Sequence, residues 1–89
     1  MSDSDESLLK FPCSFPIKAM GRTDMDLGPV VVAIIRKHVD DLGEGATRER
    51  LSRAGKYTSI TVTIRATSQA QLDAIYQDLS DCEEVLMAF

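Results

Sequence analysis

The sequence predicts an α+β fold in which a four-stranded antiparallel sheet carries two helices on one face. Two stretches, residues 13–22 and 57–67, alternate between apolar and polar side chains as half-buried strands do. Each is followed by a stretch whose apolar residues recur at helical spacing. Weaker strand patterns at residues 46–53 and 83–89 complete the order β-α-β-β-α-β.

The first strand is predicted over residues 13–22. One face would carry Cys13, Phe15, Ile17 and Ala19, and the other Ser14, Pro16, Lys18 and Met20. Prolines near its start are tolerated because few ladder hydrogen bonds are lost there. Gly21 is expected to end the strand.

The first helix is predicted to begin within about two residues of Asp26, because Pro29 fits only in a first helical turn. Asp24 or Asp26 could cap it. Its many β-branched residues lower its helix propensity, so packing must stabilise it. We expect it to end near residues 40–41, before a glycine-containing loop.

The second half repeats this plan with clearer patterns. Residues 46–53 are typical of a charged edge strand, and residues 54–56 of a tight turn. The strand at 57–67 is rich in β-branched residues. Thr67 or Ser68 would cap a second helix at residues 68–81, and residues 83–89 would form the last strand.

This order is that of the ferredoxin-like βαββαβ sandwich, with sheet order 4-1-3-2. Residues 8–89 would form that single domain, and residues 1–7 a disordered acidic tail. The topology places Cys13 and Cys82 at opposite ends of a strand roughly 20 Å long. We expect no disulfide between them, because a disulfide needs α-carbons within about 7 Å.

Composition limits the function classes. The chain has 89 residues and a net charge of −4, which disfavours a general nucleic-acid binder. No run reaches the roughly 18 apolar residues of a membrane span, and the acidic start is unlike a signal peptide. The two cysteines are expected to be thiols. We therefore predict a cytoplasmic protein without membrane association.

No catalytic set is evident. His38 is the single histidine, and at a helix C-terminus it is expected to be structural. Cys13 shares the parity of Phe15 and Ile17, which favours a packed side chain over a nucleophile paired with His38. No metal-binding cysteine spacing or phosphate-binding glycine motif is present. We predict no enzyme, no metal and no cofactor.

The uncovered face of the sheet is predicted to be basic and threonine-rich although the chain is acidic. By parity it carries Lys18, Met20, Arg48, Arg50, Ser52, Tyr57, Ser59, Thr61, Thr63, Arg65, Leu86 and Ala88. One interpretation is a solvated face of strand-favouring residues. The other is a surface for a second copy, a partner protein or an anionic ligand.

RNA binding on this face is the alternative from another class. RNA-recognition domains share this topology and stack bases on aromatic residues of the open face. Gly55-Lys56-Tyr57 is a faint match to their motif, but matching aromatics inside the strands are absent. The residues involved would be Lys18, Arg48, Arg50, Tyr57 and Arg65.

Three segments resemble a known family. They are LLKFPCSFPIKAMG, GKYTSITVTIRATSQAQLDAIYQDL and the C-terminal VLMAF. Together they are similar to the YbeD-like family of small bacterial proteins of unknown function, over nearly all of residues 8–89. The match is strong at Phe11-Pro12, Phe15, Lys18 and Met20-Gly21, and also in residues 55–67 and at His38. The resemblance implies an α-β plait like that of ACT regulatory domains, which bind small effectors near the first strand-to-helix loop and often pair side by side. Family context also suggests a link to lipoate or amino-acid metabolism.

The leading hypothesis is a non-catalytic, ACT-like regulatory or interaction domain. It would bind a small-molecule effector or a partner protein, and it could pair as a homodimer through sheet edges or the open face. The predicted effector site comprises Gly21, Arg22, Thr23, Asp24, Arg53 and Lys56. The predicted interaction surface comprises Lys18, Met20, Arg48, Arg50, Tyr57, Thr61, Thr63 and Arg65.

Overall fold

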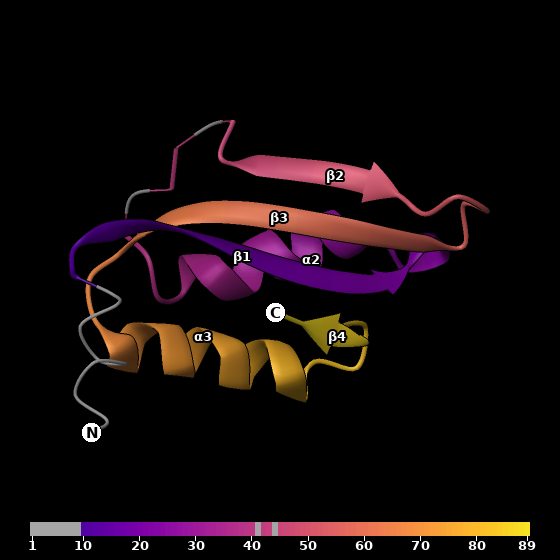
Figure 1. Ribbon diagram of the computed structural model, residues 1–89. Coiled ribbons are helices and arrows are strands. Elements are labelled where there is room, and N and C mark those ends of the chain that lie inside the picture. The colour runs from indigo at the N-terminus through magenta and orange to yellow at the C-terminus, as the bar shows by residue number, and fades with distance from the viewer. Residues whose placement is uncertain (1–9, 41, 44) are drawn as a thin grey trace, which may run out of the picture.

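The computed structural model describes residues 10–40, 42–43 and 45–89, so the expected acidic tail lies outside the described residues. The elements are β1 (Cys13–Arg22), the 3₁₀ helix η1 (Thr23–Met25), α2 (Leu27–Arg36), β2 (Thr47–Leu51), β3 (Tyr57–Ala66), α3 (Gln69–Asp81) and β4 (Met87–Ala88) (Figure 1).

The sheet has the predicted topology. Its strand order is β2-β3-β1-β4, and every neighbouring pair is antiparallel. β1 and β3 are paired over ten residues each, from Cys13 opposite Ala66 to Arg22 opposite Tyr57. Because side chains alternate along a strand, this register sends Ile17 and Val62 to the same face. The fold class and sheet order predicted from the sequence are confirmed.

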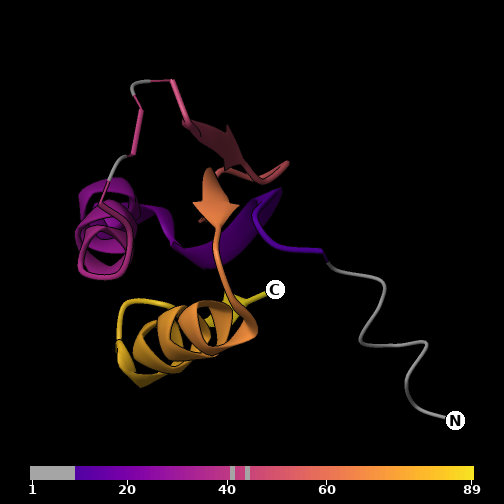
Figure 2. The same cartoon turned by 90° about the vertical axis from the view of Figure 1, so that its left-hand side faces the viewer.

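The core lies between the sheet and the two helices. β3 and β1 cross in front of α2 in Figure 1, and the view along the strands in Figure 2 leaves the opposite face of the sheet without a helix. The fully buried side chains come from both layers: Ile17, Leu27, Val31, Ile35, Ile60, Val62, Leu72, Ile75 and Leu79. One cluster therefore connects β1 and β3 with α2 and α3.

The start of α2 matches the sequence prediction better than its end does. α2 begins at Leu27, as Pro29 required, but ends at Arg36 rather than near residue 40. The amides of Lys37 and His38 donate to the carbonyls of Ile34 and Ile35, and these tight i−3 bonds end the helix. The predicted aspartate cap is wrong in detail, because Asp26 lies at the N-cap position with φ 52° and its side chain makes no capping bond.

α3 is capped as expected. The Ser68 hydroxyl accepts a hydrogen bond from the Gln71 amide at 3.1 Å. The Gln71 side chain in turn accepts a hydrogen bond from the Thr67 amide at 2.8 Å, so the amides of Thr67 and Gln71 are both satisfied at the start of α3. This exchange fixes the start of α3 one residue later than the sequence pattern suggested.

The C-terminal strand is shorter than predicted and has the opposite facing. β4 contains only Met87 and Ala88, because Val85 donates to the Cys82 carbonyl in a turn. Ala88 pairs with Ala19, on the core side, and Met87 pairs with Met20, on the open side. The prediction that Ala88 occupies the open face is therefore wrong, while Leu86 is exposed and precedes the paired residues of β4. Leu86 and Met87 are both exposed between the buried Val85 and the core-side Ala88, so the alternation breaks at residues 86–87.

Gly21 is required where β1 meets the loop after α3. A β-carbon built at Gly21 would lie against the backbone carbonyl oxygen of Glu84 and against Leu27. We expect Gly21→Ala to lower the free energy of unfolding by about 1–3 kcal/mol, because the backbone must move to make room. Urea titration followed by circular dichroism would measure this loss.

Gly28→Ala is the matched control for this prediction. A β-carbon at Gly28, in α2, would have Ile60 Cδ1 at 3.8 Å, an ordinary contact. This variant should lose no stability, since alanine favours a helix over glycine. Equal losses in the two variants would contradict the close approach at Gly21.

Candidate functional site

The β1–β3 pairing brings two loops together at one end of the sheet. Arg22 ends β1 opposite Tyr57, so η1 lies beside the turn between β2 and β3. The Thr23 amide donates to the Lys56 carbonyl at 2.8 Å. The hydroxyls of Thr23 and the buried Thr58 are 2.9 Å apart and share a hydrogen bond. These bonds hold residues distant in the sequence in one place.

A cavity of about 520 Å³ opens between these loops. It is lined by Arg22, Thr23, Asp24, Gly55, Lys56 and Tyr57. Arg22 donates to Asp24 at 2.8 Å, and both side chains are largely exposed. Such a surface pair adds little stability, but it leaves one carboxylate beside two cations. The lining therefore has a net positive charge, with hydroxyl groups from Thr23 and Tyr57.

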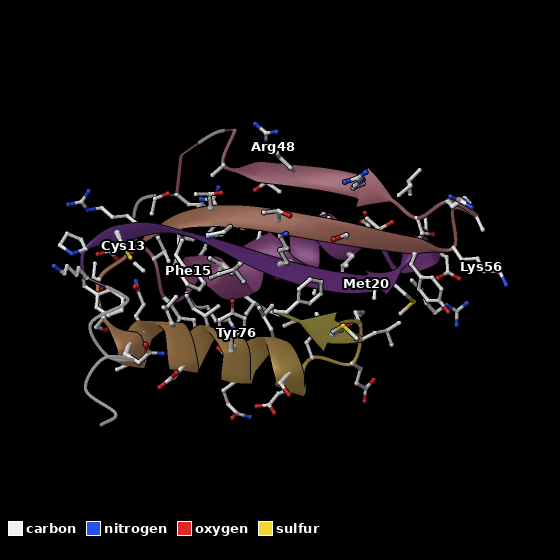
Figure 3. All side chains as sticks on the ribbon, in the orientation of Figure 1. Cys13, Phe15, Met20, Arg48, Lys56 and Tyr76 are labelled. Carbon is white, nitrogen blue, oxygen red and sulfur yellow. The ribbon has the colours of Figure 1, made fainter. Side chains whose placement is uncertain are left out.

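The structure brings together four of the six residues predicted for the effector site. Arg22, Thr23, Asp24 and Lys56 line the same cavity. Arg53 instead lines a neighbouring hollow of about 490 Å³ on the open face of the sheet, together with Arg50 and Tyr57. Gly21 is buried and lines neither space. Lys56 lies at the turn, as Figure 3 shows.

Sequence reasoning did not assign Gly55 and Tyr57 to this cavity. Gly55 has φ 77°, a left-handed conformation that glycine adopts readily, and it allows the turn to approach η1. Tyr57 was assigned to the sheet face. It contributes to both spaces because it is the first residue of β3, where the face meets the turn. The strand register, once known, would identify both residues.

The predicted interaction residues do share the open face. Arg48 lies opposite Thr61, and Thr61 lies opposite Lys18. Arg50 pairs with Ser59, which pairs with Met20. Thr63 and Arg65 follow further along β3, while Tyr57 is at its start. Figure 3 shows Arg48 on β2 and Met20 on β1.

His38 and the two cysteines lie apart from the cavity lining. His38 Nε2 is 2.7 Å from Asp78 Oδ2, and the His38 carbonyl accepts from Gln71 at 2.9 Å, so His38 links α2 to α3. Cys13 and Cys82 are both free thiols. Cys13 starts β1, whereas Cys82 follows α3 near the other end of the sheet.

Within the described ranges, no group of three or more histidine, cysteine, aspartate or glutamate side chains could hold a metal ion. No helix in that part of the chain is long and apolar enough to cross a membrane.

The fold and this cavity define a small ferredoxin-like α+β domain with a solvent-open hollow at one end of its sheet. The solution structure of protein HP0495 from H. pylori has the same fold, with a TM-score of 0.77 over 100% of this chain and 93% of that chain, at 16% identity. That likeness concerns the fold alone.

Residues 6–89 match the family described as "Protein of unknown function (DUF493)". A UPF0250 protein from Paraburkholderia phytofirmans is 42% identical over 80 residues, which cover 90% of each chain. UPF0250 protein NE1487 from Nitrosomonas europaea is 42% identical over 84 residues, covering 94% of this chain and 97% of the relative. The chain belongs to this uncharacterised bacterial family, and the family resemblance predicted from the sequence is confirmed.

The environment of Cys82 gives a testable reactivity. Burial and the hydrogen bond from Sγ to Glu84 Oε1, 3.1 Å away, raise the pKa of the Cys82 thiol. In a Cys13→Ser variant, iodoacetamide should therefore alkylate folded Cys82 more slowly at pH 8 than the same chain in denaturant, because less thiolate is present. Mass spectrometry of timed samples would measure both rates.

Glu84→Gln separates the two causes. Without the carboxylate the pKa of Cys82 should fall, and alkylation of the folded protein at pH 8 should become faster. An unchanged rate would show that Glu84 does not favour the protonated thiol.

Proposed function

We propose that this chain is a non-catalytic, ACT-like regulatory domain that binds a small carboxylate-bearing effector in the cavity between η1 and the β2–β3 turn. The observation that carries the proposal is the convergence of Arg22, Asp24 and Lys56 around one open cavity. Two cations and one carboxylate at a solvent-open site are suited to reversible binding of a charged small molecule.

The charges favour a zwitterion such as an amino acid. A ligand carboxylate would accept hydrogen bonds from Lys56 and from the Arg22 guanidinium, and charge-assisted bonds of this kind are stronger than neutral ones. A ligand ammonium group would bind Asp24, which already lies 2.8 Å from Arg22. Lipoate offers the same carboxylate without an ammonium group, so it is the natural comparison ligand.

A ligand in this cavity would connect two separate loops. η1 follows β1 and leads into α2, while Gly55 and Lys56 belong to the turn after β2. These loops already contact each other through the Thr23 amide and the Lys56 carbonyl. An effector that bridges them would restrict the turn and the edge strand β2, and this is how binding could be communicated to a partner.

Ligand binding can be followed by NMR on the ¹⁵N-labelled protein. Titration with single amino acids and with lipoate should shift the amides of residues 22–24 and 55–57 at millimolar or lower concentrations. Lys56→Ala should weaken the binding about fivefold or more, since one charge-assisted bond is lost.

Arg65→Ala is the matched control, because Arg65 is an exposed cation at the far end of β3, opposite Ser14. It should leave the affinity unchanged. No amide shifts with any of these ligands, or equal weakening by both variants, would contradict the proposed effector site.

A further inference from the structure

The open face of the sheet has two chemically different halves. Across β2, β3, β1 and the C-terminal residues, one row of neighbours consists of Arg48, Thr61, Lys18 and Phe89. The next row consists of Arg50, Ser59, Met20 and Met87. Phe89 belongs to its row because its amide and carbonyl both bond to Lys18, at 2.8 Å each. The face is therefore cationic at the β2 edge and apolar at the β4 edge.

The cationic half has no acidic counterpart. At the open-face positions of the described strands there are five cations, Lys18, Arg22, Arg48, Arg50 and Arg65, and no carboxylate. Of these five cations, only Arg22 forms an ion pair within the described part of the chain, and its partner is Asp24. The chain as a whole has a net charge of −4. Exposed acids such as Asp73, Asp81 and Glu83 lie on α3 and the loop after it, so the two surfaces differ in sign.

The apolar half exposes large side chains. Met87 is 53% exposed and Phe89 54%, and the half-buried Met20 lies between Met87 and Ser59. Tyr57, 41% exposed, adds an aromatic ring at the end of the face. Methionine, aromatic residues and arginine are enriched in protein interfaces, while aspartate and glutamate are depleted there. This face has that composition.

A second copy of the chain would offer this face no acidic residues from the open-face positions of its own described strands. Two open faces packed with their β2 edges together would bring the arginines of β2 against each other. Two β2 edges joined into one continuous sheet would also oppose arginines, because Arg48 and Arg50 are the open-face residues of β2. Like charges directly opposite each other destabilise such pairing.

We propose that the open face docks a partner protein whose surface presents acidic residues beside an apolar side chain. The acidic residues would bind Arg48, Arg50 and Lys18, and the apolar side chain would contact Met20, Met87 and Phe89. A protein fits better than single-stranded nucleic acid, because base stacking needs aromatic rings and the centre of this face is formed by Thr61, Ser59 and Lys18. The side chains that would make these docking contacts do not line the effector cavity, and the test does not require the effector.

Site-specific photocrosslinking in the source bacterium tests this docking. The variant Thr61→p-benzoylphenylalanine places the crosslinker in the middle of the face, between Lys18 and Arg48. We expect a discrete protein adduct, and mass spectrometry should locate the crosslinked peptide in an acidic segment that also contains an apolar residue. The same crosslinker at Gln77, exposed on α3, should not form this adduct.

Charge reversal supplies the second part of the test. Combining Arg48→Glu and Arg50→Glu with the crosslinker should reduce the yield of the adduct about tenfold or more. Charges at an interface change the rate and the affinity of association. Lys37→Glu, an exposed cation after α2, should leave it unchanged. Unaltered amide spectra would show that these variants fold. An adduct with a second copy, with nucleic acid or with a non-acidic segment, an adduct indifferent to charge reversal, or no adduct would overturn the proposal.

Discussion

The antiparallel pairing of β1 with β3 is the constraint on which the rest of the structure depends. Ten consecutive pairs connect the two central strands. Because side chains alternate, a slip of one residue would turn Ile60, Val62 and Ile64 to the uncovered face. Each such side chain contributes about 1.5–3 kcal/mol when buried. Exposing all three would offset much of the roughly 5–15 kcal/mol by which a domain is stable.

The same register produces both candidate functional surfaces. Pairing Arg22 with Tyr57 at one end of the ladder brings Thr23 to Lys56, and the cavity forms where these loops meet. Pairing Lys18 with Thr61 aligns the cationic row of the open face. Tyr57 belongs to both surfaces, since it lines the cavity and the neighbouring hollow on the sheet. A ligand in the cavity would therefore contact a residue at the border of the proposed docking face.

The elements with a strong alternating or helical pattern could be predicted from the sequence, whereas the exact element ends and the residues brought together by strand pairing could not. Alternation in β1 and β3 and the position of Pro29 gave the strands, the sheet order and the start of α2. The end of α2 was missed because the i−3 bonds of Lys37 and His38 leave no sequence signal. The facing of β4 differs from the prediction because the alternation breaks at Leu86 and Met87, which are both exposed. The sequence did not indicate that Tyr57 and Gly55 line the cavity, because this follows from the pairing of Arg22 with Tyr57.

Both proposed surfaces therefore require the observed register of the two central strands. Cross-strand nuclear Overhauser effects between backbone protons of β1 and β3 test this register most directly. We expect contacts that follow the observed pairs, with Ile17 opposite Val62, Lys18 opposite Thr61 and Gly21 opposite Thr58. Contacts displaced by one residue, such as Ile17 opposite Thr61, would contradict it, because they would exchange the core and the open face.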